Sequence, residues 1–223
     1  MSGSAHVAMK TMSLKELHVV LGHISAHMIK DLYRHGRIPG IQLTDTSTDF
    51  ECRPCILAKS THKHVPKVRK GGHAYAFADE VHSDLWGPAH MATLGRRLYY
   101  ISFTDDWSRW SIAYPIHAKS DVFYQYKVFV AWVKTQMGFD IKCLHTDHGR
   151  EYMSDAFITY LDEHGTEQKL TVHDTPEENG VAERLNRMLM EKVRAMMITC
   201  QLPDFLWGEA LNHAVWLKNR TWT

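Results

Sequence analysis

Apolar residues in the first part of the chain recur at helical spacing between Ser13 and Gly36. Gly22 interrupts this pattern, which therefore predicts two short helices with a bend between them. Residues 1–12 show no periodicity, and we expect them to form a flexible tail. The recurring apolar positions are Leu14, Leu17, Val20, Leu21, Ile24, Met28, Ile29 and Leu32.

Beyond residue 76 the pattern changes to short apolar runs that alternate with longer amphipathic segments. The short runs, bounded by turn residues, predict strands, and the longer segments predict helices. The result is an α/β unit that occupies residues 76–223. We expect its strands at 78–84, 98–105, 110–116, 141–146 and near 169–172, and its helices at 121–137, 154–164, 179–199 and 205–219.

Three carboxylates occupy distinctive places in this pattern. Asp84 and Asp147 each end a predicted strand, and Glu183 lies one turn into a predicted helix, with 35 residues between it and Asp147. Carboxylate oxygens are hard ligands that suit Mg²⁺, which keeps open positions for phosphate and water. The alternative is that these residues only form caps and turns, as we expect for Asp105 and Asp106.

Two other charged groups near these carboxylates have simpler interpretations. Glu177 and Glu178 precede a predicted helix, where negative charge favours the helix start. His145 and His148 flank Asp147 and suggest a histidine metal site, but no His-Glu-x-x-His pattern supports a hydrolytic zinc centre.

Composition and charge limit the class of protein more than they identify it. The 223 residues are enough for one substantial core and a small second unit. No apolar stretch approaches the roughly 20 residues of a membrane-spanning helix, and the N-terminus lacks a secretory signal pattern, so we expect an intracellular protein without membrane contact. The net charge of +1 is uninformative, but residues 61–75 form a basic linker. The cations from residue 59 to 70 are Lys59, Lys63, Lys67, Arg69 and Lys70, with no acidic residue among them.

The pair Cys52-Arg-Pro-Cys55 has the spacing of a zinc knuckle. Residues 13–60 bury too little surface to be stable alone, which also favours a bound metal. His18 and His23 complete one ligand set if the chain bends at Gly22, whereas His23 and His27, one helical turn apart, would also chelate. Ordinary polar histidines on a helical hairpin remain the alternative.

Cys143 and Cys200 have apolar neighbours, and we expect both to pack in the core.

Several ordered motifs resemble one known family. Leu17-His-Val-Val-Leu-Gly-His23 and Cys52-Arg-Pro-Cys-Ile-Leu-Ala-Lys-Ser60 are similar to the zinc domain that precedes the core of copia-type (Pseudoviridae) LTR-retrotransposon integrases. The resemblance extends from about Leu14 to Thr221. Its further motifs are His82-Ser-Asp-Leu-Trp-Gly-Pro88, Tyr100-Ile-Ser-Phe-Thr-Asp-Asp106, His145-Thr-Asp-His-Gly-Arg-Glu-Tyr152, Asn179-Gly-Val-Ala-Glu-Arg-Leu-Asn-Arg187 and Leu206-Trp-Gly-Glu-Ala210.

The resemblance implies a fold and a site. The fold is an RNase H-like core with a five-stranded mixed sheet flanked by helices, after a small helical zinc-binding domain. Asp84, Asp147 and Glu183 correspond to the family's DDE triad and would hold Mg²⁺ or Mn²⁺, with Asp84 shared between two ions. The zinc ligands would be His18, His23, Cys52 and Cys55, which leaves His27 as a surface or packing residue.

The implied reaction is 3′-end processing of element DNA and its strand transfer into target DNA, by in-line displacement without a covalent enzyme intermediate. The partners would be double-stranded DNA and further copies of the chain, and the site of action would be the nucleus, after a cytoplasmic virus-like particle. Basic residues of the linker and of the Glu183 helix are candidates for phosphate contacts. They are Lys59, Lys63, Lys67, Arg69, Lys70, Arg184, Arg187, Lys192 and Arg194.

The chain departs from the family pattern at a few positions. His148 stands where Asn is common after the second aspartate, Leu17 replaces a common Trp, and Ala58 replaces a usual Gly. The chain ends at Thr223, before the C-terminal DNA-binding region that the family leads us to expect. A non-catalytic or domesticated DNA-binding and assembly module is therefore an alternative function. A general RNase H-like nuclease is a third, although its usual chain has no zinc knuckle.

Overall fold

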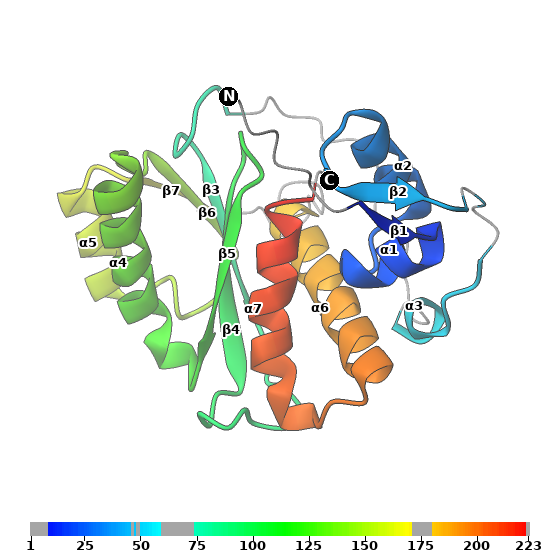
Figure 1. Ribbon diagram of the computed structural model, residues 1–223. Coiled ribbons are helices and arrows are strands. Elements are labelled where there is room, and N and C mark those ends of the chain that lie inside the picture. The colour runs from blue at the N-terminus through cyan, green and yellow to red at the C-terminus, as the bar shows by residue number, and fades with distance from the viewer. Residues whose placement is uncertain (1–8, 46, 48–49, 59–73, 171–179, 222–223) are drawn as a thin grey trace, which may run out of the picture.

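A central sheet with helices on both faces forms the larger part of the protein, and a small helical domain packs against one of these helical layers (Figure 1). The computed structural model describes residues 9–45, 47, 50–58, 74–170 and 180–221. The helices α4 (Val122–Trp132) and α5 (Asp155–Glu163) cover one face of the sheet. The helices α6 (Gly180–Cys200) and α7 (Trp207–Lys218) cover the other face and separate the sheet from the small domain.

The sheet has five strands in the order β5-β4-β3-β6-β7. β3, β4 and β5 pair antiparallel, whereas β6 pairs parallel with both β3 and β7. The sheet is therefore mixed, as the family resemblance implied. Its strands are β3 (Val81–Trp86), β4 (Tyr99–Asp105), β5 (Ser111–Ile116), β6 (Cys143–Thr146) and β7 (Glu167–Leu170).

Alternation along β4 shows how the two faces of the sheet differ. Ile101 and Phe103 point into an apolar core shared with α4 and α5, where Phe103 stacks on Phe129 with ring centroids 4.2 Å apart. Tyr100 points to the opposite face and packs with Leu189 of α6 and Trp207 of α7. Because successive side chains of a strand alternate between faces, Ser102 and Thr104 also lie on the α6 side. That face therefore carries buried polar groups among its apolar contacts.

The small domain has its own core and a short parallel ribbon. Its helices are α1 (Leu14–Val20), α2 (Ala26–Arg34) and α3 (Arg53–Ala58), and its strands are β1 (Lys10–Met12) and β2 (Ile41–Leu43). A capping box between Ser13 and Glu16 starts α1. Leu14, Leu17 and Ile29 are almost completely buried in the domain core. The two helices expected from the apolar pattern are thus present.

The bend between α1 and α2 depends on two residues in left-handed conformation, Gly22 with φ of 67° and His23 with φ of 61°. Glycine adopts this conformation without steric cost, which is why the helix ends there. A Cβ atom on Gly22 would also lie 2.5 Å from Cδ1 of Leu217 in α7. The bend of the small domain therefore rests directly on a helix of the core.

The structure differs from the sequence-based expectations in a few places. Lys10–Met12, within the expected tail, forms β1, and Cys52 and Cys55 lie at a short helix, α3. The expected helix at 121–137 ends in a π-helical turn, Val133–Met137. Cys143 is buried as expected, but Cys200 is exposed, so its predicted packing role is wrong. The basic linker lies almost entirely outside the described residues.

Candidate functional site: a carboxylate centre and a zinc-type cluster

Two parallel strands and one helix supply the three carboxylates. Asp84 lies within β3, opposite Ser102 of β4, rather than at the strand end that we expected. Asp147 follows β6 directly, and β6 runs parallel to β3, with His82 paired to His145. The two aspartates are therefore each two residues beyond the same register pair. Glu183 is exposed in the first turn of α6, the helix that covers this face.

Hydrogen bonds from α6 and from β3 itself hold the Asp84 carboxylate, and β4 acts on it through Asn186. The side-chain amide of Asn186 in α6 donates a hydrogen bond of 2.8 Å to Asp84 Oδ2, and the backbone N–H of Leu85 donates one of 2.9 Å to Oδ1. Ser102 donates to Asn186 Oδ1 at 3.0 Å. Since an amide presents both a donor and an acceptor, these two hydrogen bonds of the Asn186 side chain fix its orientation. The helix that carries Glu183 is thereby tied to the strand that carries Asp84.

The surroundings of Asp84 change the pKa of its carboxyl group. Burial, with the negative charge of Asp147 and then of Glu183, raises the pKa of Asp84 from 3.8 to about 7, against the opposing hydrogen bonds from Leu85 and Asn186. A carboxyl pKa rises in this way when its charged form is desolvated beside other anions. The protein thus gathers negative charge around Asp84, and a bound divalent cation would relieve it.

The donor set of this centre suits Mg²⁺ or Mn²⁺. Asp84, Asp147 and Glu183 offer only carboxylate oxygens, the ligand type that these ions prefer. Asp147 Oδ1 also accepts a hydrogen bond of 2.9 Å from the Gly149 N–H, which orients the carboxylate. A hydrogen bond of 2.8 Å between the Tyr152 and Ser83 hydroxyls fastens the following segment to β3. The residues present therefore fit the implied metal.

A second candidate metal centre lies in the small domain. The side chains of His18, His23, Cys52 and Cys55 place one ligand atom each within 4.8 Å of all the others. His23 Nδ1 lies 3.1 Å from His18 Nε2, 3.3 Å from Cys52 Sγ and 3.4 Å from Cys55 Sγ. Two imidazoles and two thiols in a compact group form a common structural Zn²⁺ set. His27 is exposed and takes no part in this group.

The outer hydrogen bonds of both histidines aim their lone pairs at this cluster. His18 Nδ1 lies 2.7 Å from the Ile24 carbonyl oxygen, which accepts only, so Nδ1 carries the proton and Nε2 is left with a lone pair. Thr199 donates its hydroxyl proton to the Ala195 carbonyl at 2.8 Å, so at 3.3 Å it accepts from His23 Nε2. His23 Nδ1 is then the unprotonated nitrogen. Such partners are typical of metal-binding histidines.

Comparisons with known proteins agree along almost the whole chain. Residues 79–176 match the family described as "Integrase core domain". The chain is 34% identical over 219 residues, 98% of its length, to the retrovirus-related Pol polyprotein from transposon TNT 1-94 of Nicotiana tabacum. The chain thus contains an integrase core domain, and these matches agree with its resemblance to copia-type retrotransposon integrases. It spans 16% of that tobacco polyprotein, so it corresponds to one part of a much longer relative.

Two further matches of the chain are more distant. It is 28% identical over 211 residues, 91% of its length, to the transposon Ty1-DR6 Gag-Pol polyprotein of Saccharomyces cerevisiae and spans 12% of it. A solved structure, described as the HTLV-2 integrase catalytic core domain in complex with magnesium in a trimeric form, has 15% identity and a TM-score of 0.46. That match covers 62% of this chain and 83% of the HTLV-2 chain.

The candidate DNA-binding residues of the chain have different surroundings. Arg184 and Arg187 are half-buried near Glu183, and Arg194 is exposed and donates a hydrogen bond of 2.9 Å to the Ala58 carbonyl of the small domain. Lys192 is only 6% exposed, between α6 and the small domain, so it does not face solvent as the expected phosphate contact would. The remaining candidates, Lys59, Lys63, Lys67, Arg69 and Lys70, lie outside the described residues.

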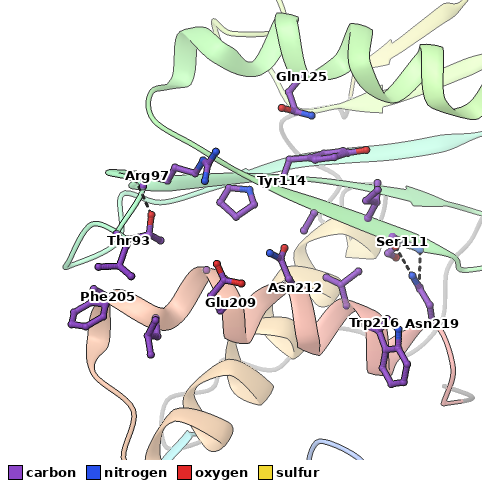
Figure 2. Close-up of a pocket in the computed structure, with 18 of the residues that line it drawn as sticks. Thr93, Arg97, Ser111, Tyr114, Gln125, Phe205, Glu209, Asn212, Trp216 and Asn219 are labelled. Atoms are coloured by element: carbon purple, nitrogen blue, oxygen red, sulfur yellow. Dashed lines mark hydrogen bonds between the residues drawn. The ribbon is translucent and has the colours of Figure 1, made fainter.

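A cavity of about 660 Å³ lies between β5 and α7, away from the carboxylates (Figure 2). Polar side chains such as Gln125, Glu209 and Asn212 line it, and Asn219 exchanges two hydrogen bonds with the backbone of Ser111 at one end. Asp84, Asp147 and Glu183 are not among the described residues that line it. This cavity is thus separate from the carboxylate centre.

Sequence reasoning missed Asn186 as a member of the carboxylate centre. Its signal was the spacing of three residues from Glu183, which places both side chains on one side of a helix. Asn186 is 5% exposed, and a buried amide in a helix requires partners. The partners become visible only when β3 and β4 are placed beneath α6.

Proposed function

We propose that this chain catalyses 3′-end processing of retrotransposon DNA and its strand transfer into target DNA. The observation that carries the proposal is the environment of Asp84. There burial, together with the charges of Asp147 and then Glu183, raises the carboxyl pKa to about 7, within a chain homologous over 98% of its length to a retrotransposon Pol polyprotein. A concentration of anions that opposes its own ionisation is typical of a functional site.

In this proposal Asp84, Asp147 and Glu183 would hold Mg²⁺ or Mn²⁺, and these ions supply activation of the attacking oxygen and stabilisation of the leaving oxygen. Asp84 would release its proton to solvent on binding these ions, because its carboxylate would then face a cation. Asn186 keeps the Asp84 carboxylate in one orientation through its 2.8 Å hydrogen bond. Water would be the nucleophile in end processing, and the freed 3′-hydroxyl would attack the target phosphodiester in strand transfer.

His18, His23, Cys52 and Cys55 would hold Zn²⁺ as a structural ion. Their lone pairs already face one another, and the donor set is closed, without a position for substrate. The folding of the small domain would then depend on zinc, and so would its contacts with α6 and α7.

The DNA partner is proposed from charge near Glu183. A cavity of about 420 Å³ borders the first turns of α6 and is lined by Arg109, Arg184 and Lys218 among others. Guanidinium groups suit phosphate oxygens because they offer paired donors. Arg184, Arg187 and the basic linker would position DNA without reading its sequence. Joining two DNA ends would require at least two copies of the chain, and the nucleus would be the place of reaction.

The other two function classes receive less support. A non-catalytic assembly module would have no need of Asn186, Leu85 and Ser102 around Asp84, yet these contacts are present. A general RNase H-like nuclease would not require the His-His-Cys-Cys cluster that precedes the core. Among the described residues no helix is long and apolar enough to cross a membrane.

The test is DNA cleavage and joining with blunt and branched donor DNA, with Mg²⁺, with Mn²⁺ and without metal. The native chain should act only with metal, and Asp147→Asn should abolish activity while folding and zinc content stay unchanged. Asp162→Asn, at an exposed position of α5, is the matched control and should retain full activity. Full activity of Asp147→Asn would refute the site, and inactivity of the native chain with both metals would favour the assembly module.

A further inference from the structure

A third group of side chains that could bind a metal lies on β3 and β6, two residues before Asp84 and Asp147. His82 of β3 and His145 of β6 are paired in the parallel register, with ring centroids 4.8 Å apart. Glu80 directly precedes β3. The ligand atoms of Glu80, His82 and His145 all lie within 4.8 Å of one another. This group shares no residue with the zinc-type cluster of the small domain or with the DDE carboxylates.

The two histidines converge on one carboxylate oxygen of Glu80. Glu80 Oε1 lies 3.3 Å from His82 Nε2 and 3.1 Å from His145 Nε2. Beside this group, Asp106 Oδ1 forms a hydrogen bond of 3.2 Å with His82 Nε2. Asp106 is fully buried and is held in place by Arg109 at 3.0 Å and by the Ala74 N–H at 3.0 Å. Two imidazole nitrogens and the Glu80 carboxylate thus surround one small volume, and Asp106 contacts this group through His82.

No hydrogen bond among the described residues accounts for the position of His145. The residue as a whole is 9% exposed, yet neither ring nitrogen has a hydrogen-bond partner among the described residues. Nε2 is near Glu80 Oε1 without the geometry of a hydrogen bond between them. A buried polar atom without a partner costs on the order of 1–3 kcal/mol, so native proteins rarely leave one. A cation at the centre of the group would take the Nε2 lone pair.

We propose that Glu80, His82 and His145 form a buried structural site for Zn²⁺ or a similar transition metal. Imidazole favours such ions over Mg²⁺, and a His₂-carboxylate set is one that zinc accepts. The site is closed and buried, so the ion would enter during folding. It would join β3 to β6 two residues before Asp84 and Asp147. A metal there fixes the spacing between the strands that carry both catalytic aspartates.

The experiment measures zinc per chain in the tag-free protein, purified with zinc and then equilibrated with excess Mg²⁺ to occupy the DDE carboxylates. The intact chain should retain two equivalents. Cys52→Ser/Cys55→Ser should retain one, and either His145→Gln or Glu80→Gln should also retain one. Asp147→Asn is the control for zinc held by the catalytic carboxylates and should retain two. Circular dichroism verifies the fold of each variant.

Cobalt substitution separates the two sites without any mutation. Co²⁺ bound by Cys52 and Cys55 gives intense thiolate charge-transfer absorption, whereas Co²⁺ bound by histidine and carboxylate gives only weak d–d bands. We expect the d–d absorption to increase up to two equivalents while the charge-transfer band saturates at one. Saturation of all bands at one equivalent would overturn the proposal. So would a second equivalent of zinc that His145→Gln and Glu80→Gln both leave in place.

Discussion

The side-chain amide of Asn186 lies 2.8 Å from the carboxylate of Asp84 and joins α6 to β3. Because Glu183 is three residues earlier on the same helix, this single hydrogen bond sets the position of the helix carboxylate relative to the strand carboxylate. Asn186 also accepts from Ser102 at 3.0 Å, so its orientation is fixed from β4. One amide therefore links all parts of the centre except Asp147.

Asn186→Ala should lower DNA cleavage and joining by about 10- to 100-fold, the usual cost of losing a residue that orients a metal ligand. It should also lower the free energy of unfolding by about 1–2 kcal/mol, since a buried hydroxyl and carboxylate lose a partner. Activity assays and urea unfolding measure the two effects. Asn212→Ala, at an exposed position of α7, is the control and should change neither. Unchanged activity in Asn186→Ala would separate this residue from the reaction.

The raised pKa of Asp84 predicts how the metal-free protein responds to pH. Between the unfolded value of 3.8 and the folded value of about 7, the folded chain holds a proton that the unfolded chain has released. The free energy of unfolding should therefore decrease as the pH rises through this range. Mg²⁺ should restore stability near pH 7, where the carboxylate charge has a partner.

Asp147→Asn should flatten this pH dependence because it removes the charge that, after burial, contributes most to the shift. Urea unfolding of the metal-free native and variant chains across the same pH range measures the difference. Asp162→Asn should follow the native profile. If Asp147→Asn and the native chain give parallel profiles, the two aspartates do not interact electrostatically.

Thr199 connects the core to the zinc-type cluster, and this contact can be tested. Thr199→Val keeps the shape of the side chain but removes the acceptor for His23 Nε2, so the correct tautomer of His23 loses its support. Zinc affinity should fall by about 10- to 100-fold. Competition with a chromophoric chelator measures it, and Thr199→Ser should retain native affinity. Equal affinities for the valine and threonine chains would show that another group fixes the His23 tautomer.

Two glycines offer a matched test of how the small domain packs on the core. Gly22 and Gly36 have φ of 67° and 65°, so alanine at either position costs about 1–2 kcal/mol of backbone strain. Only at Gly22 would the new Cβ also meet Leu217, at 2.5 Å, because nothing lies within 4 Å at Gly36. Gly22→Ala should therefore destabilise the protein more than Gly36→Ala. Thermal unfolding compares the two, and equal losses would mean that α7 yields without cost.

The sequence predicted the helices and strands better than it predicted which of their side chains are buried or in contact. The strands that carry Asp84 and Asp147 and the helix that carries Glu183 follow from apolar periodicity and turn residues, which are local. The burial of Lys192 does not, because it depends on which side of α6 the small domain covers. The pairing of His82 with His145 depends on the parallel register of two strands that are far apart in sequence. Such contacts exist only after the sheet is assembled.

The burial of Lys192 between α6 and the small domain can be tested. Its ammonium group is buried without a hydrogen-bond partner among the described residues, and burial lowers its pKa from 10.5 to about 8. At pH 7 the folded protein therefore bears the cost of a desolvated charge, and stability should rise between about pH 8 and pH 10.5, where the unfolded chain binds more protons. Lys192→Met should stabilise the protein at pH 7 and remove this rise, as measured by urea unfolding.

Lys192→Met should also leave the salt dependence of DNA binding unchanged. Arg187→Gln should instead reduce the slope of log affinity against log salt concentration by about one. A Lys192→Met chain that binds DNA as weakly as Arg187→Gln would show that Lys192 leaves its buried position to contact phosphate.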